Sequence, residues 1–214
     1  MVLTFDPIYP AFLNLKGKRA VVIGGGKVAE RKILTLLKAG ADITVISPEL
    51  TKRIEGEKQK GNIKYIQRQY RKSDLKNAFL VIAATDSQDI NKKVSKDASC
   101  PVNVVDSPSL CNFIVPSVIK RGPLTIAVST SGISPALSKS IRGELQKLYG
   151  PEFAKYLITL EKIRKKAMRE IRDKKERTRF LRNLASERVI EILRQKGFKE
   201  IAKILLSAEK DVLK

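Results

Sequence analysis

A glycine-rich segment near the start of the chain could bind a pyrophosphate. Residues 24–29 read Gly-Gly-Gly-Lys-Val-Ala and satisfy the pattern G-x-G-x-x-A. Gly24 and Gly26 stand where a tight turn and a close backbone approach are needed, and Ala29 where a helix must pack closely on a sheet. The N–H groups of Lys27 and Val28, at the start of that helix, would then face the phosphates. A glycine-rich turn without a ligand is the alternative, but the surrounding strands and helices favour dinucleotide binding.

The acid that usually binds the adenosine ribose is expected at the end of the second strand. That place holds Ser47 and Pro48, and Glu49 follows one position later. Glu49 could accept a hydrogen bond from the ribose, or it could simply start the next helix. A carboxylate here would disfavour a 2′-phosphate, so we expect the cofactor NAD rather than NADP, although Arg53, one turn further on, leaves this open.

A general base must be found without histidine. The chain contains none, which excludes Ser-His and Cys-His nucleophilic machinery and the usual zinc catalysts. The practical bases are therefore Asp, Glu, Lys or Tyr. Asp106 follows a predicted strand, on the side of the sheet where open α/β sheets bind ligands. It could instead be a turn residue, because Ser107 and Pro108 come next.

Hydroxyl side chains at two further places could contact ligands. Thr85 follows a predicted strand and should approach the cofactor, unless it only ends that strand. A second group precedes a predicted helix and could hold substrate carboxylates at the helix N-terminus. This group comprises Ser129, Thr130, Ser131, Gly132 and Ser134. A plain capped loop is the alternative, because Ser134 followed by proline is a common helix start, but substrate contact is slightly favoured.

Five short apolar runs are expected to form a parallel sheet that positions the first set of residues. They are residues 20–23, 43–46, 63–66, 80–83 and 102–105. Because these runs are apolar on both faces and helix-like stretches separate them, the sheet should be covered on both sides. The fold class is therefore α/β.

After Asp106 the pattern changes. Residues 113–115 and 124–128 resemble two more strands, with no long helix between them. A helix is expected from Pro135 to about Leu148, and beyond Gly150 apolar residues recur at helical spacing as far as Val212. Gly197 should separate the last two helices.

Composition narrows the classes of partner. The net charge is +21, but the basic residues are spread along the chain and few aromatic residues accompany them, so nucleic acid is an unlikely partner.

No segment approaches about 18 consecutive apolar residues, and residues 1–10 do not resemble a secretory signal, so we expect no membrane span. Cys100 and Cys111 form neither a metal-type pair nor a disulfide framework. A cytoplasmic protein is expected.

Together these motifs resemble the siroheme-synthase N-terminal module, which is precorrin-2 dehydrogenase and in some members also sirohydrochlorin ferrochelatase. The likeness is nearly continuous from about Phe12 to about Leu148, and residues 129–135, Ser-Thr-Ser-Gly-Ile-Ser-Pro, match a family signature. The order and spacing of the motifs are more specific than the glycine turn alone. The other segments that carry the likeness are residues 24–32, 36–37, 40–41, 45–48, 81–86, 102–106 and 113–117.

The resemblance implies a chain in three parts: an NAD-binding Rossmann domain at residues 1–112, a small α+β dimerisation region at 113–150, and an all-helical C-terminal domain at 151–214. It implies a homodimeric dehydrogenase that oxidises precorrin-2, with Asp106 as the catalytic residue and Thr85 beside NAD. Precorrin-2 is an octacarboxylate, so the basic residues 164–182 could attract it, or they could form only a solvated helix face.

Two alternatives accompany this reading. A bifunctional enzyme would also insert ferrous iron, with Asp106 serving both steps. The chain departs from family members that carry a histidine near the metal-insertion site, since it has no histidine, and no metal ligand is assigned. A non-catalytic NAD-responsive module is the alternative of another class.

Overall fold

Aliphatic residues form a five-stranded, fully parallel sheet in the first part of the chain, as expected from the apolar runs. The computed structural model describes residues 8–211, so Val212 and the first seven residues of the N-terminal segment lie outside the described residues. The strands are β1 (Arg19–Ile23), β2 (Asp42–Ile46), β3 (Ile63–Ile66), β4 (Leu80–Ala83) and β5 (Val102–Val104).

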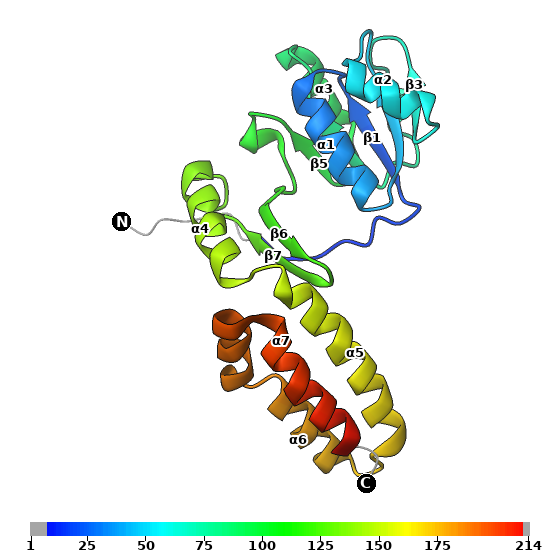
Figure 1. Cartoon of the computed structure of the whole chain (residues 1–214). Helices are drawn as coiled ribbons and strands as arrows, with labels where there is room; N and C mark the ends of the chain where they lie inside the picture. Colours follow the sequence, from blue (N-terminus) through cyan, green and yellow to red (C-terminus); the bar gives the residue numbers. More distant parts are fainter. Residues whose placement is uncertain (1–7, 212–214) are drawn as a thin grey trace. The chain divides into compact units, whose positions relative to one another are not determined.

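Helices cover both faces of this sheet (Figure 1). Because successive side chains of a strand point to opposite faces, Val22 contributes to one core and Val21 to the other. The Val22 core includes residues of α1 (Lys27–Lys38) and α2 (Lys52–Gln59). The Val21 core includes residues of α3 (Gln88–Asp97) and the short 3-10 helix η1 (Lys72–Leu75).

The strand order β3-β2-β1-β4-β5 places a switch point between β1 and β4. The chain runs outward from β1 through β2 to β3 and then returns to β4, which pairs with the other side of β1. Open α/β sheets bind ligands at the carboxyl ends of the strands beside such a point. Gly24 directly follows β1 and Ala84 directly follows β4, so both residues mark this place.

Pro116 begins a second compact unit, and Val115 ends the first. The first elements of the second unit are an antiparallel hairpin of β6 (Ser117–Arg121) and β7 (Leu124–Val128). Helix α4 (Pro135–Leu148) follows, with Ser134 as its N-cap. Three helices follow, and their apolar residues form one core: α5 (Glu152–Glu170), α6 (Lys174–Leu184) and α7 (Glu187–Asp211). Gly197, with φ at 74°, interrupts α7 where a helix break was expected.

The expected strand at residues 113–115 is wrong. These residues are irregular, and the strand begins only at Ser117, after Pro116. Phe113 instead packs against the apolar core that contains α1, and proline has no N–H for a strand ladder. The expected dimerisation region and helical domain both fall mainly within the second unit, so a boundary near residue 150 remains a prediction. Between residues 8 and 211, no helix is long and apolar enough to cross a membrane.

Candidate functional site

A cavity of about 470 Å³ opens at the carboxyl ends of β1, β2 and β4, beside the switch point. It lies entirely within the first unit. Six of the predicted cofactor residues line it: Gly24, Gly26, Ser47, Pro48, Glu49 and Thr85. The sheet therefore brings together residues from three segments of the chain that are far apart in the sequence.

The three consecutive glycines differ in the space that their surroundings leave for a side chain. Gly24 adopts φ 115°, and a side chain there would collide with the carbonyl oxygen of Ala84. At Gly25 a side chain would collide with the carbonyl oxygen of Glu49, a requirement that the sequence pattern, with a free position there, did not predict. A Cβ atom at Gly26 would meet nothing within 4 Å. Other backbone segments therefore pack directly against Gly24 and Gly25, whereas open space adjoins Gly26.

The N-terminus of α1 follows this open space. Gly26 is the N-cap residue, and the backbone N–H of Glu30 is bonded to the Gly26 carbonyl at 2.9 Å. The N–H groups of Lys27 and Val28 precede that first turn of hydrogen bonds, and such groups attract anions. Lys27 and Val28 are the two predicted cofactor residues that do not belong to the cavity lining among the described residues. Their place at the start of α1 still suits a phosphate site, because a helix N-terminus stabilises negative charge.

The end of β2 forms the next part of the cavity. Ser47 is buried, and its carbonyl accepts a hydrogen bond from the Tyr65 hydroxyl at 2.9 Å. Helix α2 begins at Lys52 with Thr51 as its N-cap, so Glu49 does not start that helix. Glu49 is exposed and lines the cavity. The structure therefore leaves its carboxylate available on the side where a ribose is expected.

Thr85 is fixed by a buried asparagine. Its hydroxyl donates to Asn91 Oδ1 at 2.9 Å, and Asn91 Nδ2 donates to the Thr85 carbonyl at 2.9 Å. Asn91 belongs to α3, which Ser87 caps by accepting from the Ile90 N–H. The turn after β4 is thus tied to α3. Thr85 can present its hydroxyl oxygen to a ligand as an acceptor, because its proton is already donated.

Asp106 occupies a strained turn at the carboxyl end of β5. It is exposed, with φ at 58°, a left-handed conformation that is uncommon for residues other than glycine but more frequent for Asp and Asn. It lies outside the described lining of the 470 Å³ cavity, on the same end of the sheet as Thr85. Burial and then Arg31 lower the pKa of Lys32, whereas the charge of Asp106 acts in the opposite direction. Lys32 of α1 is therefore within electrostatic reach of Asp106.

Two residues hold the strand and turn that carry Asp106. Cys111 Sγ accepts from the Val104 N–H at 3.1 Å and lies 3.3 Å from the carbonyl oxygen of Ser107. Asn112 Oδ1 accepts from the Val102 N–H at 2.7 Å, and the Asn112 N–H donates back to the Val102 carbonyl at 3.1 Å. The thiol of Cys111 thus has a positioning role beyond simple packing.

The predicted substrate loop, residues 129–134, belongs to the second unit. Thr130 Oγ1 accepts from the Ser134 N–H at 3.1 Å and lies 3.0 Å from Ser138 Oγ. Ser134 Oγ caps α4 by accepting from the Leu137 N–H at 3.2 Å. These two hydroxyls support the loop, as the capped-loop alternative anticipated. Ser129, Ser131 and Gly132 remain exposed, with Ser131 at φ 52°.

The cavity also contains residues that the sequence analysis did not single out. Arg68, Gln69 and Tyr70 follow β3 and form part of the lining, and Asp86 and Ser87 follow Thr85. The available signal was positional, because each segment comes just after a predicted strand, where ligand-binding residues of parallel sheets are found. No group of three or more possible metal ligands occurs among the described residues.

Comparisons with known proteins agree with this architecture. Residues 11–117 match the NAD(P)-binding family, and residues 121–148 match the family "Sirohaem biosynthesis protein central". A siroheme synthase of Thioalkalivibrio sulfidiphilus is 38% identical over 187 residues, covering 86% of this chain and 38% of the relative. A siroheme synthase of Methylobacillus flagellatus is 43% identical over 142 residues, covering 65% of this chain and 30% of the relative.

A solved structure extends the similarity to nearly the whole chain. The structure titled "SirC, precorrin-2 dehydrogenase" superimposes with a TM-score of 0.78 and 30% sequence identity, covering 94% of this chain and all of that one. The chain spans only about two fifths of the length of the Thioalkalivibrio relative, 38%. The match to the NAD(P)-binding family agrees with the predicted cofactor. Sequence, fold and glycine turn lead to one conclusion: the chain belongs to the family of the siroheme synthase N-terminal module.

Proposed function

We propose that this chain oxidises precorrin-2 to sirohydrochlorin, with NAD as the hydride acceptor and Asp106 as the general base. The observation that carries this proposal is the similarity to a precorrin-2 dehydrogenase over 94% of the chain. The cavity beside the glycine turn supports it. Two free cysteines, Cys100 and Cys111, are consistent with the expected cytoplasmic location.

The residues of the cavity fit a dinucleotide. The open space at Gly26 and the N-terminus of α1 suit a pyrophosphate, and Glu49 suits the 2′-hydroxyl of the adenosine ribose. When bound, NAD would supply a nicotinamide ring that accepts a hydride. Thr85 would orient the cofactor from the β4 side, because Asn91 fixes its hydroxyl. Glu49 would disfavour the additional phosphate of NADP.

Asp106 would receive the proton that leaves together with the hydride. The oxidation removes two electrons and one proton as hydride, and a second proton must leave the tetrapyrrole for the charges to balance. A carboxylate at the end of β5 can accept it, and the left-handed turn holds that carboxylate in solvent rather than in the core.

The proposal is tested by an anaerobic turnover assay with precorrin-2 and NAD, followed by ultraviolet–visible spectroscopy. Sirohydrochlorin should accumulate together with one NADH for each substrate oxidised. Adding ferrous iron would reveal whether siroheme also forms. NAD binding without any spectral change of precorrin-2 would contradict the dehydrogenase and favour the non-catalytic module.

We also propose that the exposed members of the 129–134 loop contact substrate carboxylates. Ser129 and Ser131 are exposed, and the N-terminus of α4 follows them. A helix N-terminus stabilises negative charge. Thr130 and Ser134 would contribute indirectly, because their hydroxyls hold the loop.

We also propose a homodimer built from residues 113–148, most of which belong to the second unit. Within its hairpin, Ile119 is the one fully buried side chain, and a two-stranded hairpin has marginal stability in water. Apolar side chains on the hairpin, on the loop that follows it and on α4 are exposed, among them Val118, Ile133, Leu137 and Leu148. A symmetric partner would cover such a surface.

Sedimentation equilibrium at micromolar concentration should therefore show a dimer. Leu137→Asp should shift the chain to a monomer, because Leu137 on α4 is 51% exposed and a charge there would be buried in the dimer. Ile158→Asp is the matched control, since Ile158 on α5 is 47% exposed outside the proposed interface. A monomeric wild-type chain, or equal effects of the two variants, would refute the proposed interface.

A further inference from the structure

The wall of the cavity next to the ribose side contains an arginine. Arg68 comes two residues after β3, the strand that pairs with β2. The two strand ends are joined by side chains, because Tyr65 donates to the Ser47 carbonyl at 2.9 Å and Gln67 donates to the Pro48 carbonyl at 3.3 Å. Arg68 and Glu49 line the same cavity. In dinucleotide sites, an arginine near the end of β2 is the usual partner of a 2′-phosphate.

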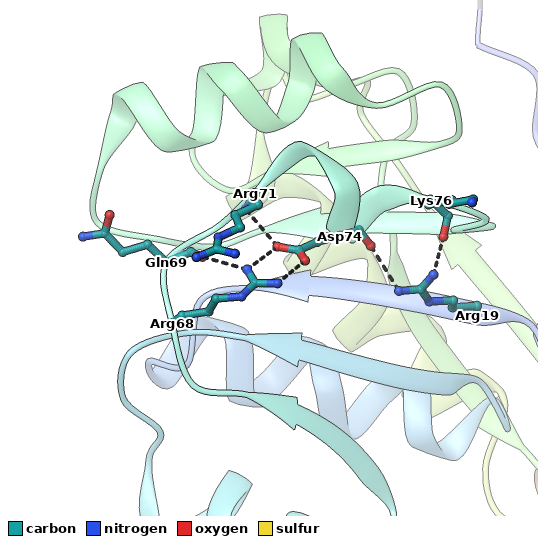
Figure 2. Close-up of polar contacts among 6 residues, drawn as sticks. All are labelled: Arg19, Arg68, Gln69, Arg71, Asp74 and Lys76. Atoms are coloured by element: carbon teal, nitrogen blue, oxygen red, sulfur yellow. Dashed lines mark hydrogen bonds and ion pairs between the residues drawn. The ribbon is translucent and has the colours of Figure 1, made fainter.

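This arginine is already bound by a carboxylate. Arg68 Nη2 donates to Asp74 Oδ1 at 2.6 Å and Arg68 Nη1 donates to Asp74 Oδ2 at 2.8 Å (Figure 2). The Asp74 side chain is only 4% exposed. Together with the Arg71 N–H, which donates at 2.8 Å, the guanidinium outweighs burial and holds the pKa of Asp74 below its usual value. The carboxylate therefore stays charged, and it satisfies two of the donors of Arg68.

The fold holds Asp74 in place independently of Arg68. Arg19, at the start of β1, donates to the main-chain carbonyl of Asp74 at 3.1 Å and also to that of Lys76. Figure 2 shows Asp74 between Arg68 on one side and Arg19 on the other. On the α3 side, the Tyr70 hydroxyl donates to Asp97 Oδ2 at 3.0 Å. The segment from Arg68 to Asp74 is thus fastened to β1 and to α3, and Arg68 is not a freely moving surface cation.

We propose that Asp74 is a specificity-determining residue for the cofactor. By pairing with Arg68, it withdraws the guanidinium from the place where a 2′-phosphate would otherwise find a bidentate partner. Glu49 then presents negative charge to the same region. The inference rests on the proposed cofactor site, and it assigns the discrimination against NADP to a buried residue that makes no predicted contact with the cofactor.

The test is the Asp74→Asn variant, with NAD and NADP binding measured separately by calorimetry. Asparagine has the same shape and can still accept from the Arg71 N–H, but it no longer neutralises Arg68. The ratio of the NADP dissociation constant to the NAD dissociation constant should fall by roughly tenfold or more, the gain expected from a charge-assisted contact to phosphate. The double variant Asp74→Asn/Arg68→Gln should restore the wild-type ratio.

A matched control removes the same charge elsewhere. Asp42 begins β2, at the opposite end from Ser47, and forms an exposed pair with Lys64 at 3.8 Å. Asp42→Asn should leave the ratio unchanged, which excludes a general effect of net charge. An equal shift in Asp42→Asn and Asp74→Asn would overturn the proposal, as would an unchanged ratio in a folded Asp74→Asn variant.

If Asp74→Asn does not fold, Gln69→Arg tests the same idea on the surface. Gln69 is exposed and lines the cavity, and Asp74 is already paired with Arg68. An unpaired guanidinium there should lower the NADP-to-NAD ratio of dissociation constants, and an unchanged ratio would contradict the inference. Wild-type binding separates the two proposals: a wild-type chain that binds neither dinucleotide refutes the cofactor site itself, whereas tight NAD binding with unresponsive variants refutes only the role of Asp74.

Discussion

Replacing Asp106 with asparagine should lower the turnover of precorrin-2 by about a hundredfold or more, the usual loss when a general base is removed. Asparagine keeps the size of the side chain and tolerates the left-handed conformation at φ 58°, but it cannot accept a proton at neutral pH. The affinity for NAD and the melting temperature should change little, because Asp106 is exposed and lies outside the cavity lining in the described chain.

A second substitution separates catalysis from the turn. Asp106→Gly satisfies the positive φ even better than asparagine does, because glycine adopts this conformation without steric cost. If Asp106 only supports the turn, the glycine variant should retain activity; if it is the base, this variant should be as inactive as asparagine. Asp89→Asn, an exposed carboxylate in the first turn of α3, controls for the change in charge. Near-wild-type turnover of either Asp106 variant would rule out the catalytic role.

Gly26→Val should weaken NAD binding by about tenfold to a hundredfold, the cost of losing one or two hydrogen bonds to a charged phosphate. The valine side chain would occupy the open space at the N-terminus of α1, where the pyrophosphate is proposed to lie. The free energy of unfolding should change by less than about 1 kcal/mol, the usual range for a helix N-cap, because a Cβ atom at Gly26 meets nothing within 4 Å.

Gly24→Ala provides the contrast for this prediction. Its side chain would collide with the carbonyl oxygen of Ala84, at a backbone φ of 115° that alanine rarely adopts. Thermal unfolding should therefore reveal a clear loss of stability for Gly24→Ala and almost none for Gly26→Val. Unchanged NAD affinity in a folded Gly26→Val variant would mean that the pyrophosphate does not lie over this turn.

The parallel sheet could be predicted from the sequence because its strands are buried on both faces. Runs such as residues 80–83, all apolar, are typical of strands in a sheet that helices cover on both sides. The same signal failed at residues 113–115, which are also apolar. Phe113 is partly buried by a contact with the α1 core rather than by strand pairing, and a short apolar run does not distinguish these two situations.

The site was predictable where its chemistry is local. The glycine turn, the residues after β2 and Thr85 could be located because each lies within a few residues of the end of a strand. Two contacts could not be located in this way: the ion pair of Arg68 with Asp74 and the hydrogen bond of Thr85 with Asn91. Both depend on side-chain directions that only the folded turns determine. In each pair the first residue lies in a loop and the second in the helical element that follows, so no single helical or strand repeat links the two in the sequence.

The contacts of Cys111 and Asn112 have a consequence for solubility. β5 is the last strand of the sheet. The residues that flank it, 101 and 105, bond to β4, so the polar backbone groups of Val102 and Val104 point outward. Outward groups of this kind form a template on which a strand from another molecule can grow. Here Asn112 occupies both groups of Val102, and the Cys111 thiol bonds to both groups of Val104. Cys111 and Asn112 therefore block intermolecular β-pairing along β5, and the sheet cannot be extended there into an aggregate.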